Sequence, residues 1–472
     1  AIRPPQTIHR RMLCNMFQQL PEGFESQMKR LLGEAGFFAY LDALNQPYTR
    51  ALRVNLLLRP DGTPPCPIDG LGAPVPWAKG AYFVEGDARP GLSPLHEGGL
   101  FYMQEPSALT AVTALDPQPG ERVLDLCAAP GGKSTQIAAL MAGQGLLVCN
   151  EPVPNRAQIL SRNVERMGVR NAVVVSALPD ALAPRFPAFF DRILVDAPCS
   201  GEGMFRRQPE ARGEWDADSP HRCADRQMEI LEQAAKMLRP GGTMVYSTCT
   251  FNDIENEGVL KRFLALHPEF TLQPFALPGL PEAKDGYLHL YPHEMRGEGH
   301  FVSRLNKSAD TSETESPVQA VPKKKTSARP AASAKGKAPA PIALPDVFSD
   351  AFTPNRLYAA GDALWMLPEQ ISIERLHGLR VLRTGLLLAH AEGRRSEPDH
   401  ALAMALRPKE AARTANLTIE QALAYQAGET LALGDLPGGY TLLCCEGVSL
   451  GWGKQAGGMM KNHYPKGLRR RN

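Results

Sequence analysis

Short apolar runs rich in β-branched residues alternate with segments of helical periodicity through the middle of this 472-residue chain. Strands are predicted at the following five segments: 121–127, 145–151, 171–176, 191–196 and 242–247. Helices are predicted between them, at 133–143, 155–168 and 227–238. Successive strands separated by helices can all run in one direction, so the alternation favours a parallel, doubly wound α/β sheet.

The unusual residues of this region follow the predicted strands. A glycine-containing loop follows the first, Glu151 the second, the segment from Asp196 to Cys199 the fourth, and Cys249 the fifth. Ligands of doubly wound sheets bind beyond the carboxyl ends of the strands. We therefore expect these residues to form one site.

The loop CAAPGGKST, residues 127–135, resembles a phosphate-binding loop in its ending GKS. A Walker loop requires glycine where this chain has Cys127, and the rigid Pro130 lies inside the turn. The dinucleotide fingerprint GxGxxG is also missing, because only Gly131 and Gly132 are present. A P-loop NTPase is thus an alternative that the loop disfavours.

A ligand with a ribose diol but no phosphate would suit such a loop. Glu151 stands about 20 residues further on, where an acid in dinucleotide sites accepts hydrogen bonds from the diol. S-adenosylmethionine has this diol and lacks a phosphate. We predict it as the cofactor.

The two strand-end cysteines, Cys199 and Cys249, suggest methylation of cytosine at C5. That carbon is a poor nucleophile until a thiolate adds to C6, a form of nucleophilic catalysis by cysteine. An acidic partner is needed on the N3 side of the ring, and Asp196 shares the predicted site. Asn252 and Glu255 fit a capping pair for a following helix.

Composition and the remaining cysteines point to a cytoplasmic protein without a metal site. Nine cysteines are sparse and irregularly spaced, and no CxxC pair suggests zinc. Neither a signal peptide nor an apolar run long enough to span a membrane is expected. Six cysteines are predicted to be structural: Cys14, Cys66, Cys149, Cys223, Cys444 and Cys445.

The chain divides at a segment rich in Ala, Pro, Ser, Thr and Lys, residues 307–345, which we predict to be a flexible linker. The other predicted units are an N-terminal RNA-binding or substrate module at 1–100, a catalytic domain at 101–306, and C-terminal domains at 346–410 and 411–472. From Gly447 onward there are six Lys or Arg and no acid, interleaved with Trp452, His463 and Tyr464. Basic and aromatic groups together suit a phosphate backbone with unstacked bases.

Four segments, VLDLCAAPGGKSTQIA, ILVDAPCSGEGMFRR, MVYSTCTFNDIENE and HLYPHEMRGEGHFVSRL, closely resemble the bacterial ribosomal RNA cytosine-5 methyltransferases of the RsmF/Sun type. The ending GWGKQAGGMMKNHYPKGLR resembles the PUA-like RNA-binding domain of RsmF-type members. The resemblance implies a class I (Rossmann-like) methyltransferase fold with an N-terminal module and a PUA-like domain. It also implies a 16S rRNA substrate, naked or within the assembled small subunit.

Carried onto matching positions, the resemblance makes Cys249 the nucleophile and Cys199 the residue that assists release of methylated RNA. Asp196 and Lys133 complete the catalytic candidates. The cofactor pocket is implied to contain Cys127, Ala128, Ala129, Pro130, Gly131, Gly132, Lys133, Glu151 and Asp196.

One departure from the family pattern concerns the third strand. The family commonly places a polar or acidic residue after it, near the adenine. Here Ser176 is followed by Ala177 and Leu178, with Asp180 beyond Pro179.

We predict a monomeric, cytoplasmic 16S rRNA (cytosine-5) methyltransferase. Besides the P-loop NTPase, the alternative is a non-catalytic RNA-binding protein that keeps the fold, which the intact cysteines and glycine loop disfavour.

Overall fold

A computed structural model of the chain describes residues 20–310, 342–392 and 395–469. A nine-stranded mixed sheet forms its centre, in the order β10-β12-β9-β8-β5-β6-β7-β15, with β11 paired to β12. Five neighbouring strands are parallel, as predicted: β5 (Arg122–Asp125), β6 (Leu146–Asn150), β7 (Ala172–Ser176), β8 (Phe190–Asp196) and β9 (Leu238–Thr248). The antiparallel strands beyond β9 are β10 (Phe270–Leu272), β11 (Tyr287–Leu290) and β12 (His300–Lys307).

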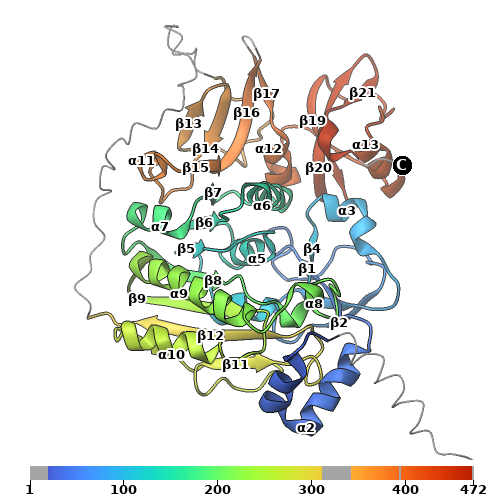
Figure 1. Ribbon diagram of the computed structural model, residues 1–472. Coiled ribbons are helices and arrows are strands. Elements are labelled where there is room, and N and C mark those ends of the chain that lie inside the picture. The colour runs from blue at the N-terminus through green and yellow to red at the C-terminus, as the bar shows by residue number, and fades with distance from the viewer. Residues whose placement is uncertain (1–19, 311–341, 393–394, 470–472) are drawn as a thin grey trace, which may run out of the picture.

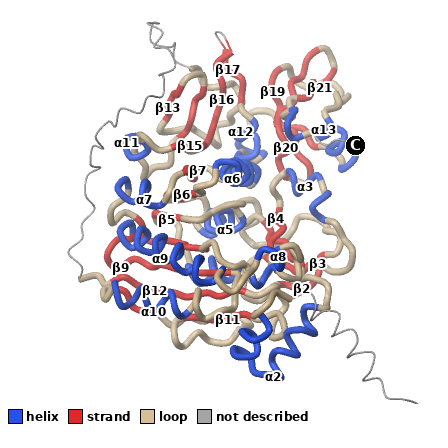
Figure 2. The backbone as a smooth tube through the Cα atoms, in the orientation of Figure 1, coloured by secondary structure: helices blue, strands red, loops and turns tan. Residues whose placement is uncertain are grey.

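Helices cover both faces of this sheet, which gives the three-layered arrangement seen in Figures 1 and 2. Successive strand residues alternate between the faces, so Val123 packs in one apolar cluster and Leu124 in the other. The first cluster contains residues of α4 (Leu109–Leu115), α5 (Gly132–Leu140) and α6 (Pro154–Arg166). The second contains residues of α7 (Pro179–Leu182), α9 (Ser219–Met237) and α10 (Glu257–Leu266). The predicted fold class is confirmed.

The N-terminal part consists of one long helix, α2 (Phe24–Leu44), and an antiparallel sheet in the order β2-β3-β1-β4. The strands are β1 (Arg50–Val54), β2 (Leu71–Pro74), β3 (Ala81–Val84) and β4 (Phe101–Gln104), and α3 (Pro94–Glu97) precedes β4. Strand β4 pairs with β1. The N-terminal sheet therefore extends past the predicted boundary at residue 100.

The first C-terminal part pairs with the central sheet. Strand β15 (Arg380–Arg383) lies antiparallel to β7 and so closes one edge of the catalytic sheet. Next to it in the chain are a four-stranded sheet and a helix: β13 (Leu357–Ala360), β14 (Ala363–Met366), β16 (Leu386–Glu392), β17 (Arg395–Pro398) and α12 (His400–Ala405). Sequence alternation did not reveal this edge pairing, because β15 lies about two hundred residues from its partner.

The last part consists of a four-stranded sheet and α13 (Ile419–Ala427). Its strands are β18 (Thr414–Asn416), β19 (Gly439–Cys445), β20 (Val448–Ala456) and β21 (Met459–Asn462). Trp452 and Tyr464 are only 2% and 3% exposed. These two rings form core here and cannot stack on bases, so that part of our prediction for the basic tail is wrong.

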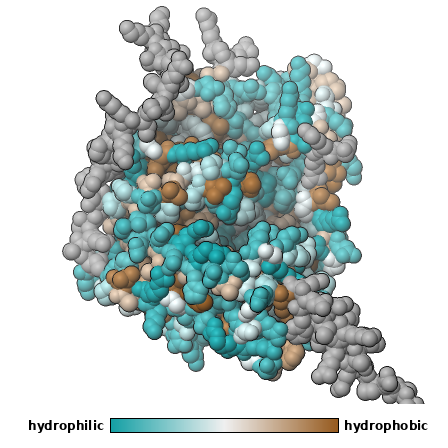
Figure 3. All heavy atoms as spheres, viewed as in Figure 1, coloured by the Kyte–Doolittle hydropathy of each residue, from teal (hydrophilic) through white to brown (hydrophobic). Residues whose placement is uncertain are grey.

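Of the predicted linker, residues 311–341 lie outside the described residues, as does the predicted structural Cys14. Lys307 is the last residue of β12, and its buried Nζ donates hydrogen bonds to the carbonyl oxygens of Ala235 and Leu238. Placing Lys307 in the linker was therefore wrong. In the described part of the chain no helix is long and apolar enough to cross a membrane, and hydrophilic residues predominate on the face drawn in Figure 3.

Candidate active site

The two strand-end cysteines lie in contact. Cys199 follows β8 and Cys249 follows β9, and their Sγ atoms are 3.2 Å apart. The backbone N–H of Cys249 also donates to Cys199 Sγ over 3.3 Å. The hydrogen bond with Cys249, together with burial, raises the pKa of the Cys199 thiol well above its ordinary value. Cys199 is therefore a neutral thiol at neutral pH, held against its neighbour.

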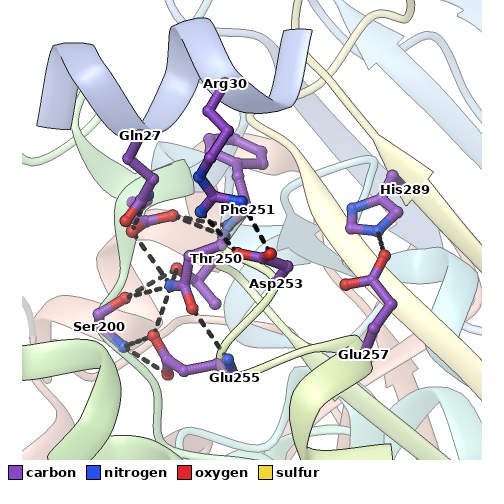
Figure 4. Close-up of polar contacts among 11 residues, drawn as sticks. Gln27, Arg30, Ser200, Thr250, Phe251, Asp253, Glu255, Glu257 and His289 are labelled. Carbon is purple, nitrogen blue, oxygen red and sulfur yellow. Dashed lines mark hydrogen bonds and ion pairs between the residues drawn. The ribbon is translucent and has the colours of Figure 1, made fainter.

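Two buried carboxylates fix the loops that carry these cysteines, and Figure 4 shows part of this network. Glu202 accepts hydrogen bonds from the backbone N–H groups of Phe251 and Asn252, at 2.8 and 3.0 Å. It also accepts one from Gln27 of helix α2, at 2.8 Å. The N-terminal helix and both catalytic loops thus meet at one carboxylate.

The second carboxylate, Glu255, is fully buried and accepts from Ser200 N at 3.0 Å, Asn252 Nδ2 at 2.7 Å and Gln227 Nε2 at 2.7 Å. Asn252 Oδ1 in turn accepts from Glu255 N at 2.9 Å. The predicted pair therefore exists but does not begin a helix, because α10 starts only at Glu257. Glu255 instead ties the turn to the Cys199 loop.

Asp196 lies at the end of β8 among three polar partners. Lys133 Nζ is 2.8 Å from its Oδ2, Ser247 Oγ donates to its Oδ1 over 2.8 Å, and His300 Nε2 lies 3.5 Å from Oδ1. Burial would raise the pKa of Asp196, but Lys133 and His300 outweigh it and hold that pKa well below its usual range. Burial lowers the pKa of Lys133, but the neighbouring Asp196 outweighs burial, so the pKa of Lys133 is raised overall. The two side chains form an ion pair at neutral pH.

The predicted cofactor loop joins β5 to α5. Gly131 has φ +113°, a left-handed conformation that other residues rarely adopt, and α5 begins at the next residue. The Pro130 and Ala129 carbonyls accept hydrogen bonds from Asn163 and Arg156 of α6. Burial raises the pKa of Cys127 far above its ordinary value, so this thiol is neutral. Hydrogen bonds from α6 thus fix the loop. Cys127, as a neutral thiol, is not a reactive nucleophile.

Glu151 follows β6 and is 2% exposed. Its Oε1 accepts from Val153 N at 2.9 Å, and Arg156 Nη1 lies 3.4 Å from its Oε2. Each oxygen retains a lone pair for a further donor. A carboxylate with free acceptor capacity beside a glycine turn fits the diol of S-adenosylmethionine.

After β7, Ala177 N donates to Asn150 Oδ1 at 3.1 Å, and Ser176 Oγ donates to the Pro152 carbonyl. Asp180 lies in the short helix α7 and is exposed. Among these described residues, no acidic side chain lies at the end of β7 where the family commonly has one near the adenine.

Four residues of the site were not singled out from the sequence: Asp125, Glu202, His300 and Ser247. Asp125 is fully buried and accepts from Ser134 Oγ at 2.6 Å, while its Oδ1 has no partner among the described residues. Burial raises its pKa to about 7. A signal existed for all four, because each lies within or directly beside a segment that resembles the family, but their roles depend on contacts between distant strands.

Family comparisons cover nearly the whole described chain. Residues 112–306 match the family 16S rRNA methyltransferase RsmB/F, and residues 20–106 match the N-terminal domain of 16S rRNA methyltransferase RsmF. Residues 345–406 match the RsmF rRNA methyltransferase first C-terminal domain, and residues 412–470 the RsmF PUA domain. Ribosomal RNA small subunit methyltransferase F of Escherichia coli O127:H6 is 33% identical over 468 residues, covering 95% of this chain and 96% of the relative.

The chain belongs to the RsmF family of 16S rRNA methyltransferases. The enzyme of the same name from Enterobacter sp. strain 638 is 35% identical over 470 residues, with 95% of each chain covered. Membership in the RsmF family confirms the predictions of a 16S rRNA (cytosine-5) methyltransferase and of S-adenosylmethionine as its cofactor.

Solved structures agree with this fold. A methyltransferase homologue from Pyrococcus horikoshii has a TM-score of 0.53 and 30% identity, covering 65% of this chain and 100% of that protein. NSun6 from Pyrococcus horikoshii, solved with SFG, has a TM-score of 0.52 and covers 61% of this chain and 98% of its own. At 23% identity the second comparison supports the fold alone.

Proposed function

We propose that this RsmF family member methylates cytosine C5 in 16S rRNA with Cys249 as the nucleophile and Cys199 as the residue that assists product release. The observation that carries the assignment is the 3.2 Å contact between the two Sγ atoms at the ends of adjacent strands. Two thiols this close can both reach one pyrimidine ring and act on it at successive stages of a single reaction.

The thiolate of Cys249 forms a bond to C6, which makes C5 electron-rich. The 127–133 loop and Glu151 would hold S-adenosylmethionine, whose sulfonium would supply an electrophilic methyl group to C5 and depart as a neutral thioether. Water then takes the C5 proton, and the bond between C6 and Cys249 Sγ breaks as the C5–C6 double bond re-forms. The thiol is regenerated when Cys249 sulfur regains a proton.

Cys199 suits the later stage because its thiol stays neutral. A neutral thiol touching Cys249 Sγ can donate its proton to the departing sulfur, and the water that takes the C5 proton returns a proton to Cys199. The raised pKa of Cys199 disfavours attack on the ring by this second cysteine.

Asp196 and Lys133 act together on the N3 side of the ring. An ionised Asp196 accepts a hydrogen bond from the amino group or from protonated N3, but it cannot itself act as the acid. The ammonium of Lys133, 2.8 Å away, is the cation that offsets negative charge on the ring as Cys249 adds. Lys133 thus takes the place that the sequence prediction gave to Asp196 as the acidic partner.

We further propose a cytoplasmic monomer whose RNA contacts extend to the PUA domain, with naked 16S rRNA or the assembled small subunit as substrate. The acid-free end of the sequence supports the RNA contact of residues 412–470. Incubation with each substrate and S-adenosylmethionine, followed by bisulfite sequencing, tests the function. We expect one cytosine to become resistant to bisulfite conversion. If no cytosine becomes resistant, and the protein binds ATP but not S-adenosylmethionine, a nucleotide-binding protein is favoured instead.

A further inference from the structure

A basic groove lies between the N-terminal part, the catalytic domain and the first C-terminal part. It has a volume of about 470 Å³ and adjoins a second hollow of about 120 Å³, which shares Leu56, Lys79, Ala139 and Leu140 with it. Together the two hollows are lined by five cationic side chains: Arg53, Lys79, Arg170, Arg407 and Lys409. Their only acidic lining residues are Asp116 and Glu410.

The outer hollow lies away from the catalytic centre, whereas the inner hollow reaches Arg53, which donates to the Gly132 carbonyl at the start of α5. The outer hollow opens at the C-terminal end of α5, lined by Leu140 and Gly143, whereas Lys133 and the cofactor loop lie at the other end of that helix. Figure 1 shows α6 below α12, and α5 below α6 beside the N-terminal strands β1 and β4. A ligand in the groove would therefore not compete directly for the site of the cysteines.

The groove is built from side chains that hold the three parts together. Arg407 donates to the Leu57 carbonyl across the gap, at 2.5 Å. Arg170 pairs with Glu410 and donates to the Ala405 carbonyl at 2.5 Å. The described residues offer no carboxylate partner to the exposed side chains of Lys79 and Lys409. Because Arg170 neutralises Glu410, both lysines remain available to a ligand.

Arg53 lines the inner hollow and is 1% exposed. Its Nε and Nη2 donate to Gln104, Gly132 and Thr135, but Nη1 has no hydrogen-bond partner among the described residues. A buried cation with an unused donor is unfavourable unless an acceptor completes it. Burial lowers the pKa of both Arg53 and Arg407 to about 10, and both remain charged at neutral pH.

Charge counting favours an anion. Five cationic and two acidic side chains leave an excess of three positive charges. The C-terminal ends of α5 and α6 oppose this with roughly half a negative charge each, which the side chains outweigh. Cations spread over three parts of the chain suit a row of phosphates better than one compact anion.

We propose that this groove binds the phosphodiester backbone of the RNA substrate at a second contact remote from the target cytosine. The inference rests on the proposed function for the identity of the RNA. Lys79 and Lys409 contact phosphates at the rim, and Arg53 faces the inner end. Such a contact adds affinity and orientation without reading sequence.

The test is RNA affinity of the full chain with unmodified 16S rRNA fragments, measured by fluorescence anisotropy over a range of salt concentrations. Lys79→Ala with Lys409→Ala is expected to weaken binding roughly 10- to 30-fold near 0.15 M salt and to reduce the slope of log K against log salt by about two. The matched control is Lys261→Ala with Lys284→Ala, which removes two exposed lysines outside the groove. Cofactor binding by both double variants should equal that of the wild type.

Equal affinity and slope for the groove and control variants would overturn the proposal while leaving the methyltransferase assignment intact. Conversely, a wild type that methylates no 16S rRNA would overturn the proposed function, and a selective loss of RNA affinity in the groove variant would still support the groove. If inorganic phosphate at millimolar concentration binds the wild type and not the groove variant, while RNA binds both equally, the groove takes a free anion and the RNA proposal fails.

Discussion

Cys199 Sγ and Cys249 Sγ lie 3.2 Å apart although fifty residues separate them in the sequence. Adjacent parallel strands, β8 and β9, end side by side and bring the two thiols together. Glu202 and Glu255 then hold the loops through backbone N–H groups of Phe251 and Ser200. The contact is therefore a consequence of sheet order and of two buried carboxylates.

Replacing Lys133 by Met should slow methylation by roughly 10²- to 10³-fold, because a preorganised cation beside the reacting ring is removed. The acidic limb of the pH–rate profile should also move to higher pH. Lys133 helps to hold the pKa of Asp196 low, and without it burial raises that pKa, so more base is needed to ionise the carboxyl. A Lys261→Met control should change neither quantity, and an unmoved acidic limb in Lys133→Met would contradict the pairing.

Asp125→Asn should gain stability relative to the wild type as pH rises from 5 to 8. The folded-state pKa of Asp125 is raised to about 7, so its favourable contribution is present at low pH and is lost as pH rises towards 7. Asparagine does not titrate, and the difference in free energy of unfolding should shift by about 2 kcal/mol over this range. Urea unfolding of the wild type and of Asp125→Asn at pH 5 and pH 8 measures this shift. The same difference in free energy of unfolding at both pH values would show that Asp125 does not titrate in this range.

Glu151→Ala should weaken binding of S-adenosylmethionine by roughly 10- to 100-fold, the effect of losing hydrogen bonds to a charged acceptor. Calorimetry with the cofactor alone measures this without RNA. The control is Glu229→Ala, which removes an exposed acid on α9. Equal cofactor affinity in the two variants would show that Glu151 does not hold the ribose.

Removal of residues 346–472 should destabilise the catalytic domain. Strand β15 covers the edge of β7, and the buried Arg383 pairs with Glu165 of α6. Truncation would expose that edge and leave Glu165 half-buried without its cation, so the temperature of unfolding should fall by several degrees. Thermal unfolding monitored by circular dichroism tests this, and an unchanged transition would mean that the first C-terminal part is only loosely attached.

Much of the catalytic sheet could be predicted from the sequence, because short apolar strands and periodic helices are local patterns. The strand ends then located Glu151, Asp196, Cys199 and Cys249 at one edge without further information. Pairings between distant segments have no such local signal, as β15 and the extension of the N-terminal sheet by β4 show.

The same limit applies to individual side chains. Trp452 and Tyr464 resembled base-stacking residues in a basic segment, yet both are core. Trp452 lies in β20 and Tyr464 follows β21, and composition does not tell which side chains the fold buries. Asn252 and Glu255 have the spacing of a capping pair, but the Glu255 carboxylate accepts a hydrogen bond from Ser200 N. Only the fold brings Ser200 near it.

The central claim is that Cys249 forms the covalent bond to RNA and Cys199 acts later. Its most direct test is denaturing gel electrophoresis of wild-type and variant proteins incubated with labelled, unmodified 16S rRNA and S-adenosylmethionine. Cys199→Ala should accumulate a denaturant-resistant RNA adduct, whereas Cys249→Ala and the double variant should form none. An adduct from Cys249→Ala with none from Cys199→Ala would contradict the account and exchange the two roles.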